Sequence, residues 1–251
     1  MKKLILHDGN KIEINIFGKK HKFLLLLAGW THDFQYETKF INELSKKYTV
    51  LTISYPGYSQ SEENPKAQSM TFLSTIIDSV IHSQNITKFT LVGFSMGCQV
   101  VVNYLSSHPQ QHAVLISPIL HSLLHDSPLY ARILLASPFL LNIVRHFSAI
   151  KKTLVLKAYS QIGKVTEGAE NTSQFTDGRV SITGAFDTLI ATLTTFNDPV
   201  RYQDRIRFIF GDGEIMQARL DQLNIPYSII SESGHGAFDD SYNEIARLIS
   251  A

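Results

Sequence analysis

Short, almost continuously apolar runs recur along the chain and alternate with segments in which apolar residues follow helical spacing. The runs are FLLLL from Phe23, TVLTI from Thr49, FTLV from Phe89, AVLI from Ala113, RFIF from Arg207 and YSII from Tyr227. Such runs are typical of strands that are buried on both faces of a parallel sheet. Helical spacing over roughly 34–46, 70–82, 96–107, 217–223 and 242–249 predicts helices between them.

The start of the chain predicts a hairpin. Lys3 to Leu6 and Ile12 to Phe17 have strand character and flank the sequence HDGN, a turn rich in residues that accept positive φ. A hairpin followed by strand–helix units predicts an α/β fold with a mostly parallel central sheet and helices on both faces.

The alternation stops in the segment 120–200, which contains apolar helical stretches and no clear buried strand. We therefore expect a core formed by residues 1–119 and 201–251, and a helical cap formed by residues 120–200 and inserted over the sheet.

Within this cap, the most apolar stretch runs from Leu129 to Phe147. Two readings of it compete, a packed cap helix and a helix lying on a membrane surface. Arg132 and Pro138 interrupt the apolar face, which favours a packed helix broken near Pro138.

Composition and charge narrow the classes of function. A chain of 251 residues with 44% hydrophobic residues is long enough for one large α/β domain. The 23 Lys and Arg residues balance the 22 Asp and Glu residues to a formal charge of +1, and without a basic run a nucleic-acid partner is not expected.

The sequence gives no sign of export or stable membrane insertion. The longest early apolar run, Phe23 to Ala28, is too short to cross a bilayer, and the start of the chain reaches Asp8 too early for a secretory signal. The single cysteine, Cys98, allows no intrachain disulfide and is expected to be a small buried core residue. We expect a cytoplasmic location, and the oligomeric state stays open.

The strand FTLV leads into Gly93-Phe94-Ser95-Met96-Gly97, which matches the pattern G-x-S-x-G between a predicted strand and a predicted helix. In such an elbow the serine has a strained backbone, and the glycines remove side chains that would collide with the neighbouring strand and helix. Ser95 is therefore the candidate nucleophile.

A serine hydroxyl at neutral pH needs a base and a carboxylate that orients the base. His235, in SESGHGAFDD, follows the last predicted strand, at the edge where the carboxyl ends of the strands gather. After the strand RFIF the sequence GDGE offers two carboxylates, Asp212 and Glu214. The residues themselves leave the choice between them open.

The chain order of serine, acid and histidine resembles that of the α/β-hydrolases. LLLLAGWTHDF is similar to the oxyanion-loop segment of that family, with Gly29 and Trp30 in the matching places. SYPGYSQSEE is similar to its P-G-x-G-x-S turn, with Pro56, Gly57 and Ser61 matching. The resemblance covers nearly the whole chain outside the cap.

This resemblance implies that the backbone N–H groups of Trp30 and Met96 are the oxyanion donors. It also implies Glu214 as the orienting acid, three residues after the glycine that ends the strand, with Asp212 as its competitor. The chain departs from the family in having Ala28 in place of a frequent His, and Ser59 in place of a frequent Gly. Backbone donors survive a side-chain change, so these departures bear on the subfamily.

The prediction is a serine hydrolase that acts on a small-molecule ester or thioester of a small to medium apolar acyl group. Two alternatives remain, a carbon–carbon bond hydrolase with the same three residues and a catalytically silent ligand-binding protein of this fold. No nucleotide-binding pattern opens a helix, so no cofactor is expected. His121 and His125 have helical spacing but only Asp126 beside them as a third ligand, so no metal site is expected.

Overall fold

The computed structural model describes residues 1–127, 129–165, 175, 177–212, 214, 216–231, 233 and 241–250. Its strands are β1 (Lys2–His7), β2 (Asn10–Phe17), β3 (Phe23–Leu27), β4 (Thr49–Ile53), β5 (Phe89–Phe94), β6 (Ala113–Ile116), β7 (Ile206–Gly211) and β8 (Tyr227–Ile230). Every strand expected from the apolar runs is therefore confirmed. They form one eight-stranded sheet in the order β1-β2-β4-β3-β5-β6-β7-β8.

The sheet is mostly parallel. The pairs β1–β2 and β2–β4 are antiparallel, and the six strands in the order β4-β3-β5-β6-β7-β8 run parallel to one another. The predicted hairpin is present, and its turn has Asp8 at φ 49° and Gly9 at φ 80°, the paired positive angles of a tight hairpin turn.

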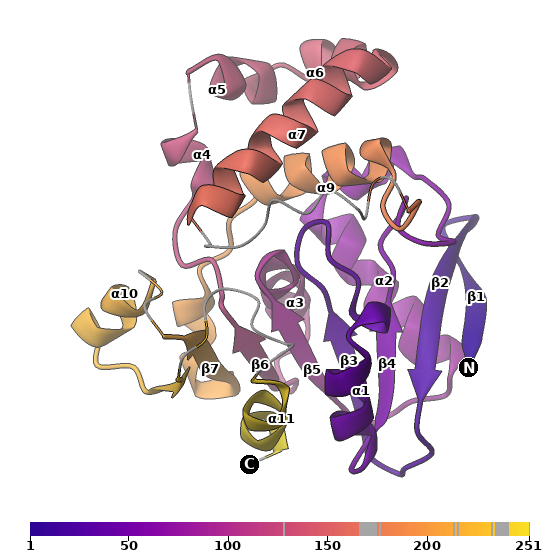
Figure 1. Ribbon diagram of the computed structural model, residues 1–251, viewed down its shortest axis with the longest axis vertical. Helices are drawn as coiled ribbons and strands as arrows, with labels where there is room; N and C mark the ends of the chain where they lie inside the picture. The colour runs from indigo at the N-terminus through magenta and orange to yellow at the C-terminus, as the bar shows by residue number, and fades with distance from the viewer. Residues whose placement is uncertain are drawn as a thin grey trace.

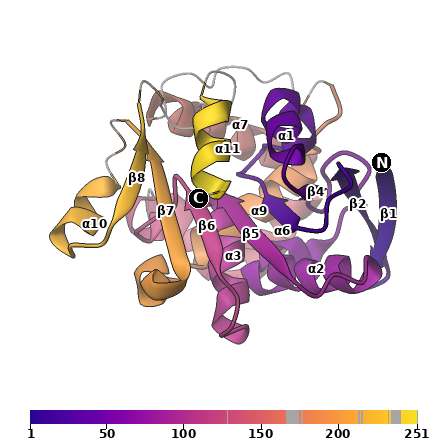
Figure 2. The ribbon, with the colours of Figure 1, turned by 90° about the horizontal axis from the view of Figure 1, so that it is seen from below.

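The helices of the sheet layers are α1 (Thr38–Ser45), α2 (Met70–Ser83), α3 (Met96–Ser107), α10 (Gln217–Gln222) and α11 (Tyr242–Ser250), with short 3-10 segments η1 (Phe34–Tyr36), η2 (Pro65–Gln68) and η3 (Pro199–Arg205). Helices α1 and α11 cover one face of the sheet, and α2 and α3 cover the other (Figures 1 and 2). The prediction of a parallel sheet with helices on both faces is thus confirmed.

The helix expected over 34–46 differs at its start. Asp33 accepts a hydrogen bond from the backbone N–H of Gln35 and begins the 3-10 turn η1. Glu37 then leaves the helical region, with φ −83° and ψ 64°, and α1 begins only at Thr38. The cap at Asp33 begins the first turn, and the non-helical backbone of Glu37 divides a segment whose apolar spacing predicts one helix.

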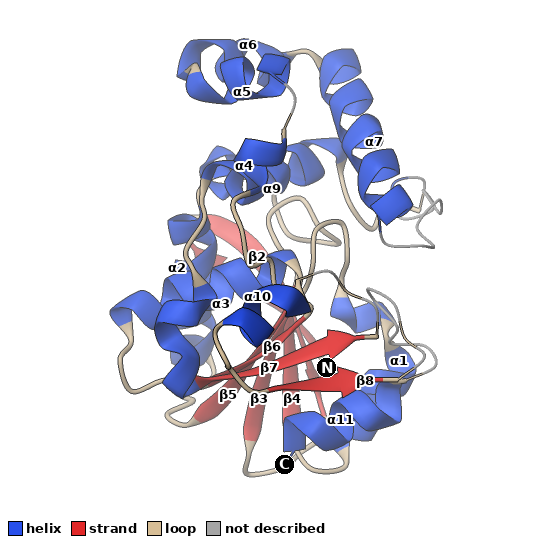
Figure 3. Cartoon of the chain, turned by 90° about the vertical axis from the view of Figure 1, so that its left-hand side faces the viewer, coloured by secondary structure: helices blue, strands red, loops and turns tan. Residues whose placement is uncertain are grey.

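The inserted segment between β6 and β7 is helical, with α4 (Leu123–Asp126), α5 (Leu129–Ala136), α6 (Pro138–His146), α7 (Ser148–Val165) and α9 (Ile182–Thr194). Figure 3 shows α9 next to the core, and α5 and α6 at the end of the molecule farthest from the sheet. We refer to α9 as the inner cap and to residues 129–150 as the outer cap. None of the helices in the described ranges is both long enough and apolar enough to cross a membrane.

The predicted break near Pro138 is confirmed, because Ser137 caps α6 and accepts a hydrogen bond from the N–H of Leu140 at 3.3 Å. The expectation that this stretch is packed is wrong for one of its faces. Leu141 is buried, whereas Leu129 and Phe139 are 70% and 72% exposed. Apolar spacing marks a helix with an apolar face, but it does not say whether a second layer covers that face.

Candidate active site

Ser95 lies at the carboxyl end of β5, in the sharp turn that leads into α3. Its backbone has φ 50° and ψ −116°, a conformation that non-glycine residues rarely adopt. The Ser95 N–H donates to the carbonyl of Ile116 at the end of β6, and its carbonyl accepts from the N–H of Cys98 at 3.0 Å. These bonds hold the turn, and Ser95 is half-buried between the buried side chains of Phe94 and Met96.

The two glycines around Ser95 are required by close backbone contacts. A Cβ on Gly97 would lie 2.1 Å from the carbonyl oxygen of Leu27, where the first turn of α3 crosses the end of β3. A Cβ on Gly93 would lie 2.7 Å from the carbonyl oxygen of Gly97. Any side chain at either position would therefore push the helix away from the sheet and move Ser95.

The loop after β3 lies against the same turn. A Cβ on Gly29 would be 3.3 Å from the Cβ of Ser95, so this loop and the serine are in direct contact. In the described chain, neither the Trp30 backbone N–H nor that of Met96 donates to a protein acceptor. Both amides belong to the two segments that meet at Ser95, which is what the sequence-based assignment of oxyanion donors requires.

The loop that contains Trp30 is fastened to the inner cap. The indole Nε1–H of Trp30 donates to the carbonyl of Ala185 in α9 at 2.8 Å. The next residue, Thr31, has φ 60°, a strained conformation for a β-branched side chain. Its N–H donates to the hydroxyl of Tyr58 at 3.0 Å, and that hydroxyl also contacts Thr188 Oγ1 of α9 at 3.0 Å.

Tyr58 is fully buried, and burial raises the pKa of its hydroxyl to about 12, so the group stays protonated. The turn that contains it packs on α9 without side chains between them, because a Cβ on Gly57 would lie 2.6 Å from the Cα of Gly184. Pro56, Gly57 and Ser61 were matched to the family's turn from sequence, whereas Tyr58 was not singled out. Its only sequence signal is its place inside that turn.

A second polar network supports the same loop. Asp33 is buried, and its carboxylate accepts hydrogen bonds from the hydroxyls of Ser54 at 2.6 Å and Ser59 at 3.0 Å and from the side chain of Gln35 at 2.9 Å. Burial raises the pKa of Asp33, while these hydrogen bonds oppose the rise. Ser59, which departs from the resemblance, has φ 49° and supplies one of these hydroxyls. Its side chain thus has a role that glycine could not fill.

The two candidate acids have different surroundings. Asp212 is exposed, and its N–H continues the sheet by donating to the carbonyl of Ile230. Glu214 is half-buried. Burial raises the pKa of Cys98 and the charge of Glu214 adds to that rise, and the backbone N–H of Cys98 bonds to Ser95. His235, the candidate base, lies outside the described residues.

The remaining residues considered from the sequence are Cys98, His121 and His125. Cys98 is buried as expected, its thiol contacts the carbonyl of Gly93 at 3.2 Å, and burial raises its pKa well above the ordinary value. His121 Nδ1 lies 3.2 Å from the sulfur of Met216. The side chain of His125 lies outside the described residues. Among the residues that are described, no group of three or more His, Cys, Asp and Glu side chains is arranged to hold a metal ion.

Comparison with known proteins gives one family and many structural neighbours. A family model for the alpha/beta hydrolase fold matches residues 22–177, more than half of the chain. No curated protein sequence matches the chain significantly.

Three solved structures illustrate the neighbours. An esterase, EaEST, from Exiguobacterium antarcticum is 18% identical with a TM-score of 0.69, over 100% of this chain and 98% of its own. The N-acyl homoserine lactonase AidH is 14% identical with a TM-score of 0.72, over 100% and 95%. The epoxide hydrolase CorEH is 12% identical with a TM-score of 0.70, over 100% and 96%. At these identities the likeness concerns the fold, which is shared by enzymes of different chemistry.

Proposed function

The chain belongs to the α/β-hydrolase family, and from this membership we propose that it is a serine hydrolase that cleaves a carboxylic ester or thioester of a small to medium apolar acyl group. The observation that carries the proposal is the strained backbone of Ser95, at the carboxyl end of a central strand and in contact with the loop of Trp30. The structural neighbours described as an esterase and a lactonase agree with hydrolysis of an ester bond.

In the proposed mechanism, Ser95 Oγ attacks the substrate carbonyl while His235 takes the hydroxyl proton. The negative charge that develops on the carbonyl oxygen is stabilised by the N–H groups of Trp30 and Met96, each worth about 10²- to 10³-fold in rate. His235 then gives its proton to the leaving alcohol or thiol, and an acyl-enzyme remains. Water, activated by the same histidine, releases the acid and restores Ser95.

We propose Glu214 as the carboxylate that orients His235. Its half-buried position supports this choice, as does its charge, which adds to the effect of burial in raising the pKa of Cys98 beside the turn of Ser95. Asp212 is exposed and continues the sheet through its backbone, and an Asp in that position serves the turn itself.

A fluorophosphonate probe tests the proposal, because it reacts only with an activated serine. Wild-type protein is expected to be labelled, and Ser95→Ala to lose labelling while its thermal unfolding is unchanged. His235→Ala should also lose labelling and p-nitrophenyl ester hydrolysis, whereas the matched control His21→Ala, at an exposed turn, should keep both. Labelling of Ser95→Ala at another serine contradicts the nucleophile, and an unlabelled wild-type protein favours a ligand-binding role.

A further inference from the structure

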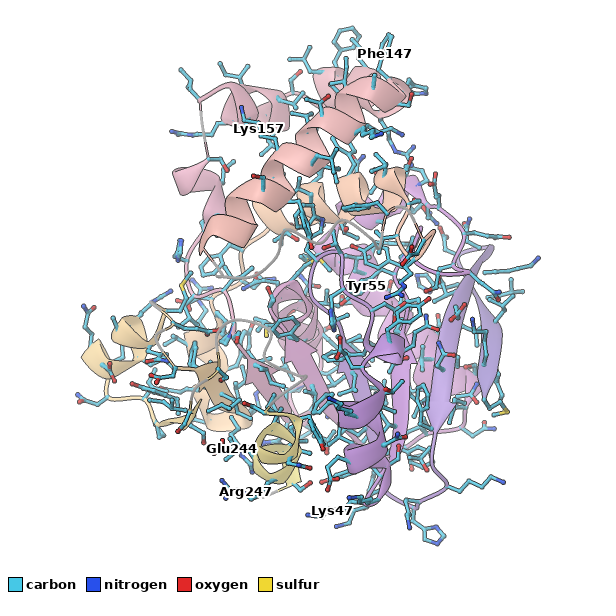
Figure 4. The ribbon with its side chains drawn as sticks, viewed as in Figure 1. Lys47, Tyr55, Phe147, Lys157, Glu244 and Arg247 are labelled. Carbon is cyan, nitrogen blue, oxygen red and sulfur yellow. The ribbon has the colours of Figure 1, made fainter. Side chains whose placement is uncertain are left out.

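The outer cap concentrates exposed apolar side chains. The described structure exposes 13 large hydrophobic residues, and seven of them lie within residues 129–150. They are Leu129, Ile133, Phe139, Leu140, Ile143, Phe147 and Ile150, with exposed fractions of 37% to 72%. Figure 4 shows Phe147 at the end of the molecule farthest from the sheet. Isolated exposed apolar residues are ordinary, but a cluster of this size marks an interaction surface.

The cluster is arranged in helical stripes. Leu129 and Ile133 are four residues apart on α5, and Phe139, Ile143 and Phe147 repeat every four residues along α6 and its end. Residues with this spacing share one side of a helix. The opposite side of α6 already packs inward through the buried Leu141, so folding of the cap does not require the outward stripe.

Charge in the same segment has one sign. The outer cap contains Arg132 and Arg145, and α7 beyond it adds Lys151, Lys152, Lys157 and Lys164, whereas residues 127–165 contain none of the 22 Asp and Glu residues. Arg132, which lies on α5 between Leu129 and Ile133 in sequence, and Lys152 at the start of α7 are exposed. Arg145 points the other way and binds the buried carboxylate of Asp187 in the inner cap at 3.0 Å. The charged side chains that residues 127–165 expose, among those the structure describes, are therefore all basic.

We propose that the outer cap binds the surface of a bilayer that contains anionic lipids. The apolar side chains would enter the boundary between headgroups and acyl chains, and Arg132 and Lys152 would meet the lipid phosphates. A second copy of the chain is a poorer occupant, because a symmetric contact through this face would bring basic residues together with no acid from the segment to pair with them. The proposal concerns attachment to the surface and does not depend on the proposed hydrolase activity.

Co-sedimentation with vesicles tests it, using the full chain. Wild-type protein is expected to sediment with vesicles of phosphatidylglycerol and phosphatidylcholine, and about tenfold less with phosphatidylcholine alone. Phe139→Ser with Ile143→Ser should weaken binding to the mixed vesicles by about tenfold or more. Arg132→Gln with Lys152→Gln should weaken it to a similar extent and reduce the loss of binding that added salt causes.

The matched control is Leu4→Ser with Leu6→Ser, which removes two exposed apolar side chains from β1 and should leave vesicle binding unchanged. Circular dichroism verifies that each variant is folded, and the charge variant, with both changes at exposed positions, tests the proposal if the serine variant does not fold. Equal loss in the control, or equal sedimentation with both kinds of vesicle, overturns the proposal. A stable dimer in light scattering that Phe139→Ser with Ile143→Ser converts to monomer also overturns it, since the face then binds a second copy.

Discussion

The inner cap and the outer cap belong to the same inserted segment but are built in opposite ways. In α9, residues 184–192 are all buried, and the helix bonds to the loop of Trp30 and to Tyr58. In the outer cap most large apolar side chains are exposed. The inner cap is therefore a structural part of the candidate active site, whereas the outer cap has a surface that the fold does not use.

This difference indicates that the inner cap and the outer cap have separate roles. A change in the inner cap should alter stability and the geometry beside Ser95 together, because the contacts are shared. A change on the outward surface of the outer cap should alter neither. The predictions below test this separation, beginning with the residues on which the chemistry depends most.

The largest effect is expected for Glu214, the proposed orienting acid, which follows β7 at the edge of the sheet. Glu214→Gln should lower kcat by up to about 10⁴-fold with little change in Tm, because the imidazole loses its orienting carboxylate. Asp212→Asn, the matched control, should keep most of the rate and cost about 1 kcal/mol of stability as a turn residue. Ester hydrolysis and thermal unfolding of both variants measure this. A large rate loss in Asp212→Asn beside a nearly active Glu214→Gln would reverse the assignment.

A substitution of phenylalanine by alanine in each cap tests directly whether the inner cap is packed and the outer cap is exposed. Phe186 in α9 is 1% exposed and Phe139 in α6 is 72% exposed. Phe186→Ala should destabilise the protein by about 3–5 kcal/mol, because it removes a buried ring and leaves a cavity. Phe139→Ala should change stability by less than about 0.5 kcal/mol. Chemical denaturation measures both, and a comparable loss in Phe139→Ala would mean that the outer cap is packed in solution.

The contribution to stability of the ion pair between the inner cap and the outer cap should depend on pH. Asp187 of α9 is buried and binds Arg145 of α6 at 3.0 Å. Burial raises the pKa of Asp187, and Arg145 opposes the rise. Arg145→Met should therefore raise that pKa further and cost about 3 kcal/mol at neutral pH, because the buried carboxylate loses its charged partner and keeps only the hydrogen bond from Gln68.

The sign of this pH dependence follows from the raised pKa. When a carboxyl group binds its proton more tightly in the folded state, the protein loses stability as the pH rises through the folded pKa. This loss is absent below the unfolded pKa of about 4. The deficit of Arg145→Met relative to wild type should thus shrink as the pH falls. Thermal unfolding over this range measures it, and Arg145→Met with Asp187→Asn, which has no charge to bury, should show no such trend.

The fold and the elbow could be predicted from sequence because both depend on local pattern. Each buried strand is a continuous apolar run, and Gly93 and Gly97 stand at fixed distances from Ser95. The contact of Tyr58 with Thr188 joins residues 130 positions apart and has no periodic signature. The exposure of the outer cap could not be predicted from the sequence either, because a helix with two apolar sides has the same spacing of apolar residues whether or not other residues cover its outer side.

The smallest effect is expected for Tyr58, which joins the inner cap to the loop of Trp30 and therefore tests the contrast between the two caps most specifically. Tyr58→Phe keeps the ring and removes the hydroxyl that accepts from the Thr31 N–H and contacts Thr188. A buried N–H without its acceptor costs about 1–3 kcal/mol, and Thr31 already has a strained backbone. We expect the loop to shift and kcat to fall about tenfold, with KM little changed, since the misplaced Trp30 amide matters most in the transition state.

Two comparisons separate positioning from general destabilisation. Tyr227→Phe also loses a hydroxyl hydrogen bond, to Asp221 on the surface, and should keep the wild-type kcat. Thr188→Val leaves the bond between Tyr58 and Thr31 in place, so its rate loss should be smaller than that of Tyr58→Phe, and the double variant should add little to Tyr58→Phe alone. If Tyr58→Phe loses stability but keeps kcat, the inner cap supports the fold without setting the oxyanion loop. In that case the contrast between the two layers concerns packing and not catalysis.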